Sequence, residues 1–460
     1  MVLVIMVQSS TPLVPLQAPK DVSIDEIEAE LAQIWQGYLA NQDGVNATRA
    51  TTFTLIIYEP EETQRLLAAL DFYNGPVDGL SGPKTTAAIK SAQKAYGLTV
   101  TGNSNPELQA KLKSAFIEAK AAGKVSEAEA NAVDHYSPDL QGAGIADAIA
   151  TSNPCRIITV CPTAGEDEGV TAQVSAYCPI QKRSQRSLIC CEYITLQGTS
   201  SALDRIGGII SALVVSELPK FVWWKATPEP DYGLFKRLCH DSDAIIIDSS
   251  TFNDPESNLL LIAELLSQGI RITDLNWSRL SPWQELAAQA FDPPERRAAI
   301  YEVDQVTIDY EKGNSTQALM YLGWLATRLQ WRPVAYEYEG GDYDIRRVKL
   351  VNPQGKEIKA ELGGIPLADW GNVLGDLISL RLSSTNLNAD CCTVLCSETA
   401  GCMRMEASGG AQACRIQQVT SVSDQNTEIL LGQQLQNRGR DPLYIETMKV
   451  TEQILKLIES

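Results

Sequence analysis

LICCEYITLQGTSSALDRIGGIISALVV, residues 188–215, contains the alternation that decides the fold. Its first part is an apolar run typical of a buried strand, and residues 202–217 have the apolar spacing of a helix. The same alternation continues on both sides. Further strands are predicted at 156–161, 172–178, 221–224 and 244–250, and further helices at 256–268, 282–291 and 314–330. This pattern predicts an α/β layered central domain with a largely parallel sheet, over residues 153–332.

Beyond this domain the pattern changes to strands without intervening helices. Segments such as IRRVKLVN and LISLRLSS alternate apolar and polar residues, which is typical of antiparallel strands joined by tight turns. A terminal helix is expected at 441–459. Residues 333–460 are therefore predicted to form an antiparallel-sheet α+β C-terminal domain.

The N-terminal part begins with a segment, 1–22, that is predicted to be irregular because prolines space it. Ser23 and Glu26 form a capping-box signature for a following helix. A strand is expected at 52–58, and it can join the central sheet, which would make 61–113 an insertion. The predicted divisions are an N-terminal helix and strand at 1–60, a small helical module at 61–120, and an Ala/Gly/Ser-rich linker at 121–152.

The net charge is −19, from 57 acidic against 38 basic residues. Such a charge repels phosphate backbones and anionic lipid, so nucleic-acid binding and membrane-surface binding are not expected. No run of 18 apolar residues is present, and the first residues, MVLVIMVQ, lack the basic region and cleavage site of a signal peptide. The sequence therefore predicts a cytoplasmic protein.

Residues for catalysis are scarce. The chain has two histidines, and His240 directly follows Cys239, a spacing that does not normally let a nucleophile and a base face each other. No G-x-G-x-x-G motif opens a helix, so a dinucleotide has no binding loop. Asp248, Ser249 and Ser250 end a strand, where α/β sites often lie, but a turn or helix cap is the preferred interpretation. No catalytic residue, cofactor or metal site is predicted.

The helical module has a recognisable pattern of turn residues. It consists of a leucine-rich helix, Val77-Asp78-Gly79, Gly82-Pro83, Thr85, Ala88, Gln93, Gly97-Leu98 and Gly102. In this pattern, the segment 64–113 resembles the three-helix peptidoglycan-binding-like fold. The glycines permit backbone turns that a side chain would block.

The central domain shows a second resemblance. It rests on five motifs: Asn153-Pro154-Cys155-Arg156, LPKFVWW (218–224), IIIDSS (245–250), ITDLNWSRLSPWQELAAQAFD (272–292) and ALMYLGWLATRLQW (318–331). They are similar to the core of the OpcA family, in its cyanobacterial form with a peptidoglycan-binding-like module. The family has a histidine where this chain has Asn153.

That resemblance implies a role and no reaction. Members of the family bind oligomeric glucose-6-phosphate dehydrogenase as assembly factors and allosteric activators, and so supply the oxidative pentose phosphate pathway. The resemblance also implies redox control through thioredoxin. Two other functions remain open on the sequence, a peptidoglycan-binding or cell-wall protein and an orphan α/β enzyme for a sugar-phosphate.

Trp277, Arg279 and Trp283 surround a predicted turn. Aromatic residues beside arginine are typical of protein–protein hot spots, so these three are candidates for a partner interface. The other interpretation, that they fill the end of the domain, stays open.

Five of the 11 cysteines fall between residues 391 and 414. Cys396 and Cys402 bracket a five-residue turn and are expected to be cross-strand neighbours, close enough for a disulfide. A disulfide across so short a loop adds little stability and is easily reduced, as a switch requires. The alternatives are buried thiols, or a zinc site made by Cys392, Cys396, Cys402 and Cys414.

Overall fold

The computed structural model divides the chain into two compact units, and each is described by itself. Unit 1 comprises residues 1–118 and 133–246, and unit 2 comprises 119–132 and 247–460. The structure describes residues 13–458 except for 41–45, 50–51, 75–76, 78–82, 126–154, 180–186, 216, 295, 367–372, 387–388, 390, 399–401, 409–415, 422–426 and 437–439. The domain boundaries given above stay a prediction, because a compact unit can hold more than one domain.

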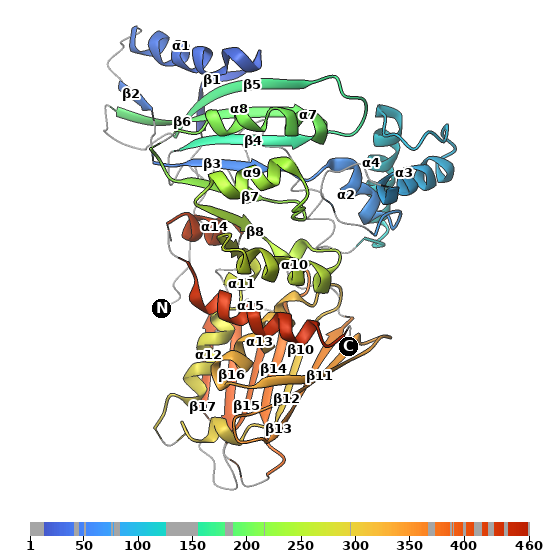
Figure 1. Cartoon of the computed structure of the whole chain (residues 1–460), viewed down its shortest axis with the longest axis vertical. Helices are drawn as coiled ribbons and strands as arrows, with labels where there is room; N and C mark the ends of the chain where they lie inside the picture. Colours follow the sequence, from blue (N-terminus) through green and yellow to red (C-terminus); the bar gives the residue numbers. More distant parts are fainter. Residues whose placement is uncertain are drawn as a thin grey trace. The chain divides into compact units, whose positions relative to one another are not determined.

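The sheet of unit 1 is built around β3 (Thr54–Tyr58). This strand pairs in parallel with β4 (Arg156–Pro162) on one side and β7 (Lys220–Trp224) on the other. β6 (Ser187–Gly198) and β8 (Ala244–Ile247) extend the parallel set outward (Figure 1). The predicted parallel sheet is therefore confirmed, and so is the place of the 52–58 strand within it.

Antiparallel strands complete one side of this sheet. β5 (Val170–Pro179) pairs with β6, and β1 (Leu13–Val22) pairs with β5, while the short β2 (Asn46–Arg49) pairs in parallel with β6. The prediction that 1–22 is irregular was wrong for the second half of that segment. A proline lacks the N–H that a central strand needs, but β1 is a strand with register shifts near Pro15, where the missing donor is tolerated.

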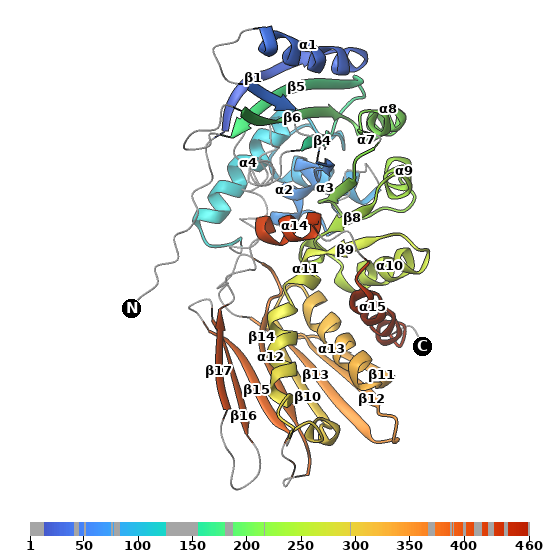
Figure 2. The same ribbon diagram turned by 90° about the vertical axis from the view of Figure 1, so that its left-hand side faces the viewer.

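Helices pack against both the antiparallel and the parallel strands of this sheet (Figures 1 and 2). They are η1 (Ile24–Glu26), α1 (Ile27–Ala40), α7 (Ser200–Arg205), α8 (Gly207–Ala212) and α9 (Gly233–Asp241). The single helix predicted at 202–217 is two helices. The break falls at Ile206, where a pair of glycines follows and a side chain on Gly207 would meet Arg237 at 3.0 Å.

The module is a three-helix insertion between β3 and β4, as expected. Its helices are α2 (Glu62–Ala69), α3 (Pro83–Ala95) and α4 (Pro106–Ala121). Gly102 has a φ of +82°, and a Cβ there would lie 2.9 Å from the side chain of Thr86. Asp78, Gly79 and Gly82 of the motif lie outside the described residues.

Unit 2 holds an eight-stranded mixed sheet. Its order is β11 (Arg332–Glu339), β12 (Ile345–Val351), β13 (Glu357–Ile365), β10 (Gln305–Glu311), β14 (Leu377–Ser383), β15 (Cys392–Glu398), β16 (Cys402–Ser408) and β17 (Ile416–Ser421). Neighbours are antiparallel except β10 and β13, which run parallel. This is the predicted C-terminal sheet, with β10 added to its middle.

Helices cover one face of that sheet (Figure 2). The helical and short elements of unit 2 are η2 (Ser249–Thr251), α10 (Pro255–Ser267), β9 (Ile272–Asp274), α11 (Leu275–Ser278), α12 (Ser281–Phe291), η3 (Ala299–Glu302), α13 (Thr316–Leu329), α14 (Thr427–Gln436) and α15 (Pro442–Leu455). α13 lies on β10 and β13, and α15 packs against α13 and α10. Of the helices in the described ranges, none has both the length and the apolar character that crossing a bilayer requires.

Candidate functional site

Trp277, Arg279 and Trp283 are buried inside unit 2. The exposed fractions are 6%, 1% and 1%, respectively. The indole of Trp277 donates to Asp441 at 2.8 Å and lies against the ring of Tyr444. This burial corrects the prediction of a partner interface, because side chains that the chain itself covers leave no area for a partner to contact.

Arg279 instead makes a buried ion pair with Asp248. Its two terminal nitrogens each lie 2.8 Å from one carboxylate oxygen of Asp248, in the bidentate geometry that suits arginine. Asp248 also caps η2 by accepting from the backbone N–H of Ser250, so the helix-cap interpretation of Asp248 is confirmed. Burial raises the pKa of Asp248, but the charge and hydrogen bonds of Arg279 outweigh it and hold that pKa below its usual range.

A second buried carboxylate lies at the end of β9. Asp274 accepts from the backbone N–H groups of Ser249, at 3.0 Å, and Asn276, at 2.9 Å. Burial, together with the nearby charge of Asp248, raises the pKa of Asp274 to about 6. Two neighbouring carboxylates therefore differ in acidity because only one has a bidentate arginine partner.

Amide side chains extend these contacts into a network. Asn276 donates to the hydroxyls of Ser249 and Thr316, and Gln317 donates to Asn276 at 2.8 Å. Asn314 donates to three backbone carbonyls, those of Ser249, Ser250 and Phe252. We call Asp248, Asp274, Asn276, Arg279, Asn314, Thr316 and Gln317 the polar core. Its hydrogen bonds join η2, α11 and the start of α13, so the arrangement is suited to fixing loops in place.

The quoted motif at 153–156 ends in another buried arginine. Arg156, 3% exposed, donates through Nε to Glu192 at 2.8 Å and also forms an ion pair with Glu28 of α1. The indole of Trp35 donates to the same Glu192 at 2.6 Å. Arg156 thus attaches α1 to the parallel strands. Asn153 lies outside the described residues.

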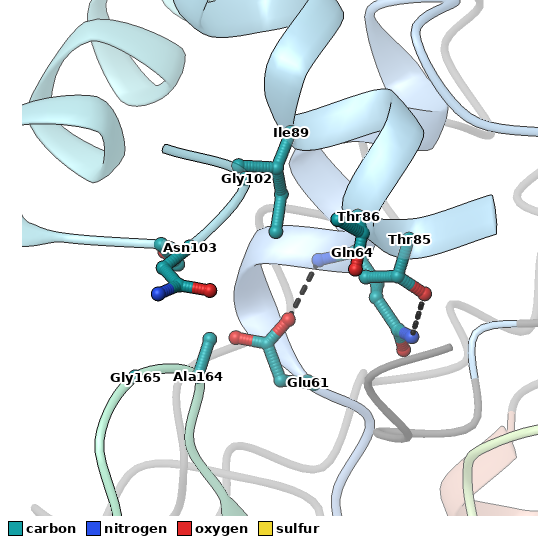
Figure 3. Close-up of a pocket in the computed structure, with 10 residues that line it drawn as sticks. Glu61, Gln64, Thr85, Thr86, Ile89, Gly102, Asn103, Ala164 and Gly165 are labelled. Atoms are coloured by element: carbon teal, nitrogen blue, oxygen red, sulfur yellow. Dashed lines mark hydrogen bonds between the residues drawn. The ribbon is translucent and has the colours of Figure 1, made fainter. Parts of the chain in front are cut away.

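A small pocket lies beside the helical module (Figure 3). Its volume is about 60 Å³, and Ala164 and Gly165, which follow β4, line it together with the module. Glu61 is buried there and accepts from the N–H groups of Thr63 and Gln64. Burial raises the pKa of Glu61. Sites for small-molecule ligands usually measure about 300–1,000 Å³, so this pocket is suited to a few water molecules.

The backbone register locates the candidate cysteine pair. Cys396 of β15 is paired with Arg404, and Cys402 of β16 is paired with Glu398. The two cysteines therefore occupy diagonal positions, two residues apart, and the prediction that they face each other directly was wrong. The side chains of the alternative zinc set, Cys392, Cys396, Cys402 and Cys414, lie outside what the structure describes. Among the other cysteines, Cys155, Cys161, Cys191 and Cys391 are buried.

Three family models match the chain. A model described as the glucose-6-phosphate dehydrogenase subunit N-terminal domain matches residues 146–264, and one described as the C-terminal domain of the same subunit matches 270–448. A peptidoglycan-binding domain model matches 59–112.

Full-length relatives are known in cyanobacteria. The OxPP cycle protein OpcA of Synechocystis sp. is 61% identical over 98% of this chain and 94% of its own length. The protein with the same name in Nostoc punctiforme is 56% identical, with 98% and 96% covered. Among solved structures, an oxidoreductase from Sinorhizobium meliloti has a TM-score of 0.38 at 11% identity, over 56% of this chain and 82% of its own.

Proposed function

This chain belongs to the OpcA family of glucose-6-phosphate dehydrogenase subunits, and on that premise we propose that it is a non-catalytic assembly factor and allosteric activator of this dehydrogenase. The supporting observation is that two dehydrogenase-subunit models match residues 146–264 and 270–448. A cytoplasmic location is part of the same proposal.

Such a subunit activates the enzyme because its binding is thermodynamically linked to the equilibrium between the enzyme's active and inactive forms. A partner that binds the active form of the enzyme more tightly than the inactive form shifts the population toward activity. The shift cannot exceed the difference between the two binding free energies, which is typically about 1–3 kcal/mol. The activator therefore needs a docking surface and no chemistry of its own.

Adding the purified chain to purified glucose-6-phosphate dehydrogenase is expected to raise its rate at sub-saturating substrate by about fivefold or more. The two proteins should also co-elute in size-exclusion chromatography. An unrelated acidic protein of similar size serves as the control. If the oxidised and the reduced chain both fail to bind the enzyme, the proposed function is rejected.

We also propose thioredoxin-linked redox control through Cys396 and Cys402. Both lie on neighbouring strands, β15 and β16, at diagonal register positions. Diagonal neighbours are about 7–8 Å apart, so a bond between them requires a local change in strand geometry. Such a coupled change is what a redox switch needs.

Cys396→Ser is expected to remove the difference in activation between the oxidised and the thioredoxin-reduced chain. The measurement is dehydrogenase activity against substrate concentration in both states. Cys239→Ser is the matched control, because Cys239 is a free, half-buried thiol of α9 in unit 1. Redox control through this pair is refuted if Cys396→Ser keeps the wild-type ratio.

The match at 59–112 favours one alternative, binding of peptidoglycan. Purified sacculi would test it, and retention of the chain on them at neutral pH would support it. The pocket beside the module argues against a glycan site there, because about 60 Å³ is too small for a sugar.

A further inference from the structure

The sheet of unit 2 has two different faces. On β13, Ile358, Ala360 and Leu362 are buried beneath the helices, whereas the residues that alternate with them, Glu357, Lys359 and Glu361, are exposed. The same alternation holds on β12 and β10. In Figure 2 the helices α12, α13 and α15 all lie on one side of these strands. The other side is exposed or half-buried wherever the structure describes it.

We call the side of this sheet that the helices do not cover the open face. The register places charged residues of both signs in rows across it. One row runs through Glu337, Arg347, Glu361, Thr307, Arg381 and Val394, on six successive strands. Arg347 is paired with Glu361 at 3.1 Å and also with Glu339. In the neighbouring rows Lys349 lies 3.8 Å from Glu337, and Lys359 lies 3.8 Å from Glu357. The open face therefore presents charged groups and hydrogen-bond donors and acceptors at positions that the strand register fixes.

The size of the face suits a stable complex. Eight strands at about 4.8 Å spacing span roughly 34 Å, and seven residues at about 3.3 Å give roughly 23 Å along each strand. The product is about 800 Å², which is what each partner contributes to an interface of standard size.

The chemistry of the face decides between two occupants. A permanent homodimer buries a mostly apolar face. The described residues of this face instead combine ion pairs with half-buried aliphatic side chains such as Ile345, Val351 and Val394, a mixture that resembles interfaces between separately stable proteins. The model described as a dehydrogenase subunit's C-terminal domain spans 270–448, which contains all eight strands.

From these observations we propose that the open face of the β10–β17 sheet is the docking surface for glucose-6-phosphate dehydrogenase. This inference rests on the proposed function and names its contact surface. It also connects the redox pair to binding, because Cys396 is paired in the register with Ser379 of β14, one row from Arg381. A change in the geometry of the β15–β16 hairpin would therefore alter the positions of the side chains that the enzyme contacts.

Lys359→Glu together with Arg381→Glu tests the surface. Both residues are exposed and lie on β13 and β14, either side of the central β10. The double variant is expected to raise the Kd for the purified dehydrogenase about tenfold or more, measured by biolayer interferometry with the full chain. Lys449→Glu with Lys456→Glu is the matched control, since it changes the net charge equally, on α15 and at its C-cap, and should keep Kd within about twofold.

Each result has a distinct meaning. Wild-type-like binding by the folded Lys359→Glu/Arg381→Glu variant would overturn the docking surface and leave the proposed function standing. Absence of binding by the wild-type chain would instead overturn the proposed function. A wild-type homodimer in light scattering that the double variant converts to monomers would assign the face to a second copy and reject this proposal. Circular dichroism and thermal unfolding show that the variants are folded.

Discussion

Replacing Arg279 with methionine is expected to lower the free energy of unfolding by about 3–5 kcal/mol. The guanidinium is 1% exposed and binds both oxygens of Asp248 at 2.8 Å. Methionine fills similar space but leaves the Asp248 carboxylate buried without a counter-charge, which is far costlier than losing a surface pair. Urea unfolding of the full chain, followed by tryptophan fluorescence, measures the loss because Trp277 and Trp283 lie beside the pair in sequence.

Arg297→Met is the matched control for this prediction. Arg297 is exposed and its Nε donates to the backbone carbonyl of Asp292, so its loss should cost less than about 0.5 kcal/mol. The double variant Asp248→Asn/Arg279→Met should recover part of the stability, since it removes both charges. A loss below about 1 kcal/mol in Arg279→Met would show that the Arg279–Asp248 ion pair contributes little to stability.

The second large effect concerns Asp274 and pH. Its folded-state pKa is raised to about 6, above its ordinary value near 4. Between these values the folded chain holds a proton that the unfolded chain has released, so stability falls as pH rises from about 4 to about 6. This one group should lower the free energy of unfolding by up to about 3 kcal/mol across that window. Above about pH 6 both states are ionised and its contribution is constant.

Asp274→Asn should flatten that dependence, because the amide oxygen can still accept from Ser249 and Asn276 but cannot ionise. Asp231→Asn is the control: Asp231 is 96% exposed and should keep the wild-type slope. The ionisable groups around Asp274 do not change charge in this pH window. Arg279 stays charged, the Tyr444 pKa is raised well above its usual value, and Asp248 titrates below its usual range. An unchanged slope between pH 4 and 6 in Asp274→Asn would contradict the prediction.

Local patterns were enough for the parallel strands and the module. Runs such as TLIIY of β3 are mostly apolar, as strands buried on both faces are, and the glycines and prolines of the module fix its turns. β1 was missed because its prolines argue against a strand unless the register shifts of that strand are known. β10 was missed because its strand, QVTIDYE, belongs to the middle of a sheet whose other strands follow it in the chain.

The candidate site shows the same limit. Tryptophan and arginine side chains such as Trp277, Arg279 and Trp283 occur both in interface hot spots and in domain cores. The residue that shows Arg279 to belong to the core is its ion-pair partner Asp248, which lies 31 residues away in the sequence. The sequence did contain a signal for this pair. Asp248 and Asp274 each stand at the end of a strand, and a buried carboxylate needs a positively charged partner such as arginine. The cysteine register depended on how the β15–β16 turn is closed, which spacing alone does not determine.

The central position of β3 has a consequence for synthesis of the chain on the ribosome. Thr54–Tyr58 is translated early, but its two neighbours begin only at Arg156 and Lys220. At about 5–20 residues per second, the first neighbour follows after roughly 5–20 s and the second later still. During this interval a mostly apolar strand lacks both of its neighbours in the sheet, while the inserted helices can already fold. A nascent-chain chaperone is therefore expected to hold this segment until β4 and β7 emerge.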